Sequence, residues 1–183
     1  MKHGFILGKF APFHQGHLFL IQQAQAQCEH LTVLVTSQAD DLIAGWQRYH
    51  WVKSIFPMLD VRHVIGSHVP SEARILQNLP VGTLILFESG IKQRSIAQGL
   101  GIQHVSIDRE RKNFPIASSK IRENPFGHSE LLPPNVRAYY IKRVALVGPE
   151  SCGKSYLAEK LALHFKTVFV PEYGRAYCEK FGM

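Results

Sequence analysis

The chain has 183 residues, which corresponds to one domain of ordinary size, or to one domain and part of a second. Hydrophobic residues make up 45% of the sequence and charged residues 19%, so it holds enough apolar material for a packed core and does not belong to the disordered class. Lys and Arg outnumber Asp and Glu by 21 to 14, and the formal charge of +7 favours anionic partners such as nucleotides, nucleic acid or acidic lipids.

The cysteines and the apolar runs indicate the cellular compartment of the protein. Cys28, Cys152 and Cys178 cannot all pair with one another and form no CxxC motif, which excludes a disulfide scaffold and fits a reducing compartment. No apolar run approaches the ~20 residues that a membrane span requires. The first residues also lack the layout of a signal peptide. We therefore expect a cytoplasmic protein with no membrane span.

Short apolar runs alternate with stretches of helical periodicity up to residue 107. Strands are expected at the β-branched and apolar runs 4–9, 31–37, 61–65, 83–87 and 102–107. Helices are expected between them, at 15–28, 46–56, 71–77 and 91–100. The repeated order of strand and helix predicts an α/β fold, with a parallel sheet and helices on both faces.

The pattern changes after residue 130, where prolines interrupt it. We expect a first domain over 1–130, a connector over 131–142 that contains a helix at 135–142, and part of a second domain over 143–183. In this last part the pattern predicts a strand at 143–147, a helix at 155–165 and a strand at 167–170.

The most informative segment reads GKFAPFHQGH and spans residues 8–17, where the first expected strand gives way to the first expected helix. A helix start carries unpaired N–H groups and a partial positive charge, so it is suited to bind an anion. His14 and His17 stand three residues apart on one side of the first turn, and Gly16 lets a ligand approach the backbone. Both imidazoles can therefore donate hydrogen bonds to phosphate oxygens, although a bare HxxH is more often a pair of surface histidines.

A second motif, GPESCGKS at residues 148–155, matches the P-loop pattern GxxxxGK[ST] between an expected strand and an expected helix. Its glycines, Gly148 and Gly153, would let backbone N–H groups surround phosphates, while Lys154 would reach the terminal phosphates and Ser155 could hold Mg²⁺. A working P-loop enzyme also needs further parallel strands and an acidic residue that holds the metal.

Family resemblance follows from these motifs. The decapeptide resembles the GxFxPxHxGH signature of the nucleotidyltransferases, and residues 116–122, IASSKIR, are similar to their ISxTxxR motif. In that motif Ser119 and Arg122 match the family, whereas Ala117 stands where the family commonly has Ser. A nucleotidyltransferase motif followed by a P-loop resembles the bacterial bifunctional nicotinamide mononucleotide adenylyltransferase/ribosylnicotinamide kinase family (NadR-type), as do the stretches WVKSIF, DRER, NPF and EYGR, which begin at residues 51, 108, 124 and 172.

The resemblance implies a Rossmann-like nucleotidyltransferase domain followed by the first βαβ portion of a P-loop kinase domain. It implies an enzyme of NAD biosynthesis that joins ATP to nicotinamide mononucleotide, releasing pyrophosphate, with Mg²⁺ held mainly by the phosphates. His17 would contact the α-phosphate and the transition state, and His14 and Arg122 would hold the β- and γ-phosphates. The other residues implied at this site are Gly8, Lys9, Phe10, Gly16, Ser119, Arg48, Trp51 and Arg111.

The resemblance also leaves alternatives open. The kinase part would be truncated and inactive, with Glu172 and Arg175 as candidates for a second site. No helix-turn-helix precedes the first strand, so DNA is not an expected partner, and a homo-oligomer stays open. Trp46 or Trp51 could stack on the nicotinamide ring or pack in the core. The acceptor could instead be phosphopantetheine or a sugar phosphate, and a decayed nucleotide-binding protein is the third reading.

Overall fold

The computed structural model describes residues 2–66, 70–89, 93–110 and 112–182. The chain divides into two compact units, residues 1–141 and residues 142–183. Each unit is described by itself.

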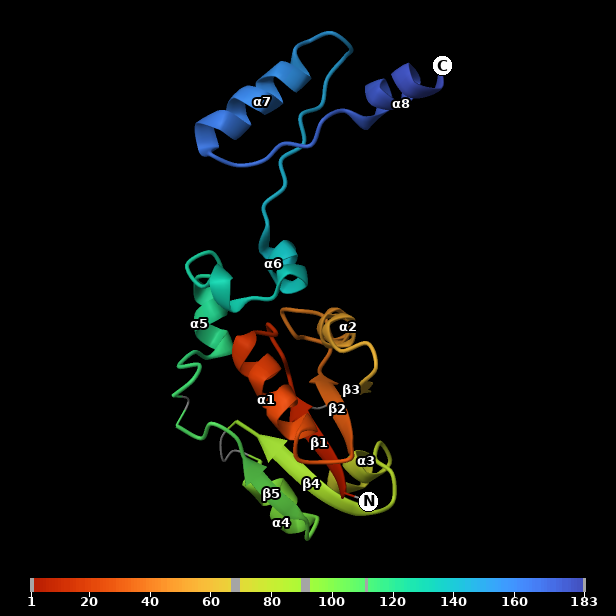
Figure 1. The fold of residues 1–183 in the computed structure, drawn as a ribbon, viewed down its shortest axis with the longest axis vertical. Helices are drawn as coiled ribbons and strands as arrows, with labels where there is room; N and C mark the ends of the chain where they lie inside the picture. Colours follow the sequence, from red (N-terminus) through yellow and green to blue (C-terminus); the bar gives the residue numbers. More distant parts are fainter. Residues whose placement is uncertain (1, 67–69, 90–92, 111, 183) are drawn as a thin grey trace. The chain divides into compact units, whose positions relative to one another are not determined.

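The first unit is built on a sheet of five parallel strands in the order β3-β2-β1-β4-β5 (Figure 1). The strands are β1 (Lys2–Gly8), β2 (His30–Ser37), β3 (Asp60–Ile65), β4 (Thr83–Glu88) and β5 (Gln103–Ser106). All five lie within a few residues of the segments expected from the sequence. The parallel sheet confirms the expected fold class.

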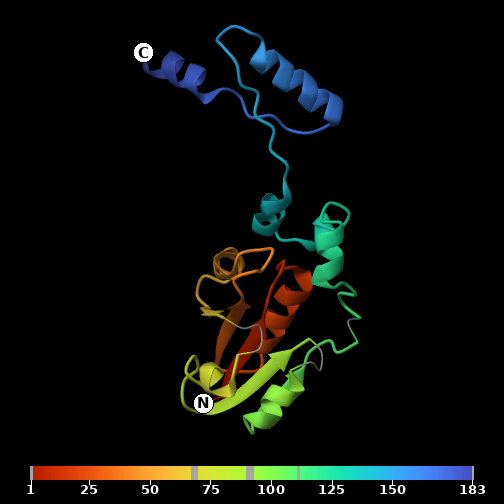
Figure 2. The ribbon, with the colours of Figure 1, turned by 180° about the vertical axis from the view of Figure 1, so that it is seen from behind.

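Helices cover both faces of this sheet, and Figures 1 and 2 show them from opposite sides. Successive residues of a strand point to opposite faces, so on β1 Ile6 packs in one core while Phe5 and Leu7 pack in the other. The core around Ile6 is covered by the two helices that link the first three strands, α1 (Gln15–Gln25) and α2 (Gly45–Ile55). The core around Phe5 and Leu7 is covered by α3 (Glu72–Leu76) and α4 (Arg94–Gly99).

The segment after β5 returns to the first of these cores. It forms α5 (Ser118–Glu123), a short 3₁₀ helix (Ser129–Leu131) and α6 (Pro134–Tyr140). Leu132 and Val136 are buried in the core around Ile6, and the Asn135 amide donates a hydrogen bond of 2.6 Å to Ser54 of α2. Most of the expected connector over 131–142 therefore packs as part of the first unit.

The second unit consists of α7 (Lys154–Phe165) and α8 (Tyr173–Phe181), without a strand in its described residues. The strands predicted at 143–147 and 167–170 are therefore wrong. Valines in both segments are exposed, because a strand is stable only beside a partner strand, and neither segment has one here. The same lack of cover leaves Phe165 of α7 68% exposed.

This difference in packing predicts a difference in local stability. We expect the backbone amides of α7 and α8 to exchange with deuterium faster than those of β1, β2 and β4, because exposed helices open at little cost. Hydrogen exchange read by mass spectrometry checks this on the intact chain. Equal protection of α7 and β1 would contradict it.

Among the described helices, none has the length and apolar character that crossing a bilayer requires.

Candidate active site

The carboxyl ends of β1 and β4 form the place in this fold where a ligand is expected. These strands are neighbours, yet the chain leaves β1 for α1 on one face and leaves β4 for α4 on the other. Ligands of open α/β sheets bind at such a reversal, outside the carboxyl ends of the strands. The decapeptide 8–17 begins at the end of β1 and continues into α1.

A tight turn leads from β1 into α1. Phe10 adopts a positive φ of 51°, and its buried ring folds back so closely over Gly8 that a Cβ on Gly8 would lie 2.7 Å from the ring. Only glycine fits that position without displacing the phenylalanine. The Phe10 ring also packs edge-on against the imidazole of His17, with 5.0 Å between the ring centroids.

Two imidazoles cap the start of α1. His14 is the N-cap residue, and its Nδ1 accepts a hydrogen bond of 3.1 Å from the backbone N–H of Gly16. His17 Nδ1 accepts from the backbone N–H of His14 at 3.3 Å, and the two rings stack with centroids 3.8 Å apart. Since each Nδ1 acts as an acceptor, each neutral ring carries its proton on Nε2. The arrangement thus gives both imidazoles an Nε2–H group at a helix N-terminus, a place that favours bound anions.

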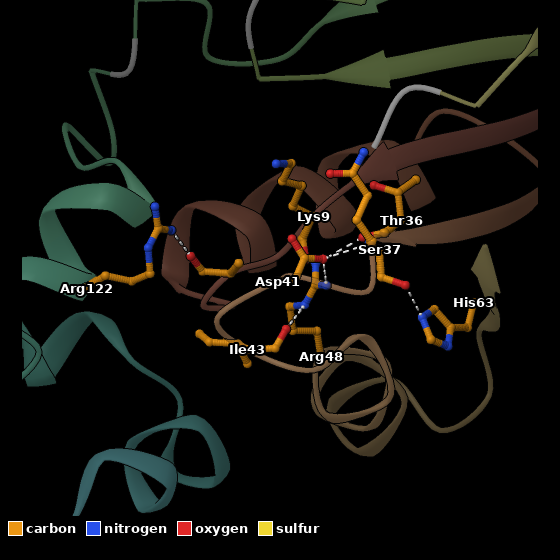
Figure 3. A network of polar contacts seen from close by, with 10 residues as sticks. Lys9, Thr36, Ser37, Asp41, Ile43, Arg48, His63 and Arg122 are labelled. Carbon is orange, nitrogen blue, oxygen red and sulfur yellow. Dashed lines mark hydrogen bonds and ion pairs between the residues drawn. The ribbon is translucent and has the colours of Figure 1, made fainter. Parts of the chain in front are cut away.

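The turn is also held through its carbonyl groups (Figure 3). Arg48 of α2 donates to the carbonyl of Lys9 at 2.6 Å, and Arg122 of α5 donates to the carbonyl of Ala11. The Ser118 hydroxyl donates to the carbonyl of Pro12 at 3.4 Å. Residues from two helices distant in sequence therefore meet at the segment that presents His14 and His17.

A cavity of about 210 Å³ opens beside these residues. Its lining includes His14, Gly16 and His17 from the decapeptide and Ala117 and Ser118 from the second motif, so the structure brings the two motifs together. Ser119 and Arg122 are exposed on α5, and Lys9 is exposed at the end of β1.

Two residues predicted to bind substrate lie in the interior instead. Arg48 has 0% exposed surface, and its side chain is bound to groups of the protein itself. Trp51 is 2% exposed and packs in the core around Ile6, so its ring is not available for stacking on a ligand. Helix α2 turns both side chains toward the sheet, and for Trp51 this is the core packing that the sequence left open. Trp46, one turn before Trp51, is 60% exposed.

His63 extends this polar region to the end of β3. Its Nε2 lies 2.7 Å from the Ser37 hydroxyl, at the carboxyl end of β2 (Figure 3). Burial and the nearby charge of Arg48 lower the pKa of His63 below its ordinary value.

The P-loop motif has its own local structure in the second unit. Gly153 is the N-cap of α7 with a φ of 84°, a conformation that favours glycine. Lys154 Nζ donates to the carbonyl of Pro149 at 2.5 Å. Glu172 is the N-cap residue of α8, while Arg111 and the side chain of Arg175 lie outside the described part of the chain.

A larger cavity of about 870 Å³ lies at the opposite, amino edge of the sheet. His3, His30 and Asp60 contribute to its lining, and burial lowers the pKa of His3. We place the candidate site at the smaller cavity because both sequence motifs converge there and because the carboxyl edge is where α/β sheets bind ligands. Within the described ranges, no three His, Cys, Asp or Glu side chains gather as a metal site.

Comparisons with known proteins agree with the order of the two motifs. The family model described as "Citrate lyase ligase C-terminal domain" matches residues 4–70, and the one described as "AAA domain" matches residues 143–182. The trifunctional NAD biosynthesis/regulator protein NadR of Salmonella typhimurium and that of Escherichia coli are each 31% identical over 206 residues, covering 95% of this chain. The chain is homologous to NadR.

Solved NadR structures share this fold. NadR in complex with NR aligns with a TM-score of 0.77 at 22% identity, and NadR in complex with NAD and AMP-PNP aligns with 0.76 at 21%. Each alignment covers 100% of this chain and 57% or 58% of the NadR chain. The chain spans about half the length of the curated NadR proteins, since it covers 49% of them. A citrate (pro-3S)-lyase ligase of Haemophilus influenzae is 27% identical over 192 residues, covering 98% of this chain and 57% of that protein.

Sequence reasoning missed several residues that the NadR-like fold brings to the cavity. Ser89 and Ile107 follow β4 and β5, while Asp108 and Phe114 belong to the loop before α5. The Asp108 carboxylate accepts the backbone N–H of Lys112 at 2.9 Å, and so shapes that loop. Asp108 already stood in the family-like stretch DRER, and position was the signal for the others, since the residues after the carboxyl ends of parallel strands gather at one edge of the sheet.

Proposed function

We propose that the first unit transfers the adenylyl group of ATP to nicotinamide mononucleotide, forming NAD and pyrophosphate in NAD biosynthesis. The observation that carries the proposal is the pair of stacked imidazoles at the start of α1, each with an Nε2–H donor, beside a cavity that α5 also lines. Homology to NadR, an NAD biosynthesis/regulator protein, supports this acceptor.

The proposed reaction needs no nucleophile from the protein. A phosphate oxygen of nicotinamide mononucleotide attacks the α-phosphorus of ATP, and the bond from that phosphorus to the bridging oxygen breaks. Pyrophosphate leaves with the electron pair. Catalysis of this kind depends on alignment and on donors placed where negative charge develops. His17 Nε2–H faces the α-phosphate in the proposal, and His14 and Arg122 bind the β- and γ-phosphates.

Magnesium enters the proposal as a complex with ATP. The described residues gather no carboxylate and imidazole cluster for a metal at this cavity, whereas Mg²⁺ readily takes phosphate oxygens and water as ligands. The ion neutralises phosphate charge when it is bound. The protein's share is then to orient the triphosphate through the imidazoles and Arg122.

The exposed Trp46 is the better of the two tryptophans for contact with the nicotinamide or adenine ring. It lies in the first turn of α2, near the carboxyl ends of β2 and β3. A flat aromatic ring at the surface can stack on a heterocycle with little loss of conformational freedom. Trp51 cannot do so from the core.

A direct assay tests the proposed activity. The purified chain is incubated with ATP, Mg²⁺ and one acceptor at a time, namely nicotinamide mononucleotide, phosphopantetheine or a sugar phosphate, and pyrophosphate release is followed. We expect release with nicotinamide mononucleotide alone, together with formation of NAD. Release with a different acceptor would support adenylyl transfer to phosphopantetheine or a sugar phosphate instead. No release with any acceptor would support a nucleotide-binding protein without catalysis.

We also propose that this polypeptide of 183 residues does not phosphorylate nicotinamide riboside. The described part of its second unit has two helices and no strand, so it lacks the sheet that carries the base and the metal-holding acid of a P-loop kinase. Lys154→Ala should leave adenylyl transfer within about twofold of the unchanged chain. Lys160→Ala, on the same helix, is the control. Phosphorylation of nicotinamide riboside that Lys154→Ala abolishes would contradict this prediction.

A further inference from the structure

Arg48 is the most completely buried charged side chain among the described residues, and the proposed reaction has no direct use for it. Its Nε donates to the carbonyl of Ile43 at 2.8 Å, and its Nη1 donates to the carbonyls of Lys9 and Thr36 at 2.6 and 3.0 Å. Its Nη2 forms a short ion pair with the carboxylate of Asp41 (Figure 3). A buried guanidinium is tolerated only when its N–H groups are paired in this way.

These partners belong to three different segments. Lys9 directly follows β1, Thr36 is the second-last residue of β2, and Asp41 and Ile43 belong to the loop between β2 and α2. One planar side chain therefore holds the carboxyl ends of two neighbouring strands and the loop beside them in a single arrangement. A lysine has one nitrogen and cannot reach these groups in the same plane.

The Lys9 carbonyl is the partner through which Arg48 can affect the proposed reaction. It belongs to the peptide between Lys9 and Phe10, and the ring of Phe10 packs against both Phe13 and His17, with centroid distances of 5.8 and 5.0 Å. A shift of that peptide moves the Phe10 ring and with it the surface against which His17 rests. Arg122 and Ser118 hold the later carbonyls of the turn from the side of α5, whereas Arg48 holds the first from the side of α2.

We propose that Arg48 is a positioning residue for adenylyl transfer: fixed by Asp41, it sets the Lys9–Phe10 peptide and thereby the orientation of the His17 imidazole. The expected effect on kcat rests on the proposed function. The effect of Arg48 on the orientation of the His17 ring does not, because it concerns contacts within this chain. In the proposed reaction Arg48 does not touch the substrate. It acts through the turn, so its loss should reduce the rate of the chemical step more than the affinity for ATP.

The test compares Arg48→Lys and Asp41→Asn with Arg62→Lys. Arg62 also pairs with one carboxylate, that of Asp60, but on the exposed side of β3 and away from the turn. We expect kcat of the first two variants to fall on the order of 10- to 100-fold, since misplacement by about 1 Å costs as much. Their dissociation constant for ATP should stay within about threefold, and Arg62→Lys should keep full activity.

A spectroscopic readout separates positioning from a merely stabilising role. Nitrogen-15 NMR of the imidazoles distinguishes the Nε2–H tautomer from its alternative. We expect His17 to be an Nε2–H tautomer in the unchanged chain and in Arg62→Lys, and a mixture of tautomers in Arg48→Lys and Asp41→Asn. Circular dichroism confirms that the compared variants are folded. If Arg48→Lys does not fold, Asp41→Asn, which keeps a hydrogen-bond acceptor beside the guanidinium, decides the outcome.

The outcomes distinguish this proposal from the proposed function. Folded variants with unchanged kcat and an unchanged His17 tautomer would overturn the positioning role. If the unchanged chain releases no pyrophosphate with any acceptor, the proposed function fails, and the NMR comparison alone then decides whether Arg48 orients His17. A changed tautomer in Arg48→Lys and Asp41→Asn would support the positioning role even in that case.

Discussion

Replacing His17 with alanine should lower kcat for pyrophosphate release on the order of 10²–10³-fold, the usual loss for one donor that acts on developing charge. The reason is the place of the ring at the start of α1, where its Nδ1 accepts the backbone N–H of His14 and its Nε2 carries the proton. A donor that meets charge formed only in the transition state contributes to the rate and little to ground-state binding. The affinity for ATP should therefore change by about threefold or less.

The variant His17→Asn separates the cap from the donor. The side-chain oxygen of the asparagine can replace Nδ1 as the acceptor for the N–H of His14, so the cap is retained while the Nε2–H donor is lost. We expect the asparagine variant to be as slow as the alanine variant. His30→Ala, at the exposed start of β2 on the opposite edge of the sheet, is the matched control and should keep its activity. A kcat of His17→Ala within about threefold of the unchanged chain would refute the assigned role.

Arg122→Lys should be nearly as damaging as Arg122→Ala. A guanidinium can bind two phosphate oxygens at once, whereas a lysine offers a single charged nitrogen. Loss of a charged hydrogen bond costs roughly 1.5–3 kcal/mol, which corresponds to a loss in kcat/KM of roughly 10- to 150-fold. In the structure Arg122 extends from the exposed side of α5 to the carbonyl of Ala11, so it already reaches the turn that presents His14.

Product inhibition by pyrophosphate shows whether Arg122 acts as a clamp. If it binds the departing pyrophosphate, both Arg122 variants should need at least about tenfold more pyrophosphate for half-inhibition. Lys120→Ala is the control, because Lys120 lies exposed on the same helix. Full activity of Arg122→Lys would leave only a general charge effect, and the bidentate contact would have to be abandoned.

The strands and helices of the first unit could be predicted closely because the residue patterns that produce them lie within short stretches of sequence. The run 31–37 is rich in apolar and β-branched residues, as is common for strands covered on both faces, and β2 follows that run closely. The start of α1 was predicted equally closely. His14 and His17 stand three residues apart around it, and the structure makes a cap hydrogen bond with each of their rings. The helix expected to Cys28 ends at Gln25, because the end of an amphipathic pattern gives a weaker signal than its start.

The second unit shows the limit of the same reasoning. Residues 143–147 and 167–170 have strand-like composition, yet they form no strand in the structure. β-propensity mostly measures how well side chains pack beside neighbouring strands, and these two segments have no such neighbours. Strand-like composition therefore does not produce a strand unless a partner strand lies beside it.

Spacing and periodicity are properties of adjacent residues, so the sequence alone predicted two imidazoles at the start of a helix after a buried strand. It also determined which motif precedes which. Three features came from the packing of distant segments: the contact of α5 with that turn, the burial of Trp51 in the core, and the internal position of Arg48. The partners of Arg48 lie 5 to 39 residues away in the chain, and the burial of a charge depends on which distant carbonyls and carboxylates surround it. Residue type and spacing do not contain that information, because it arises only when the loop after β2 folds against the end of β1.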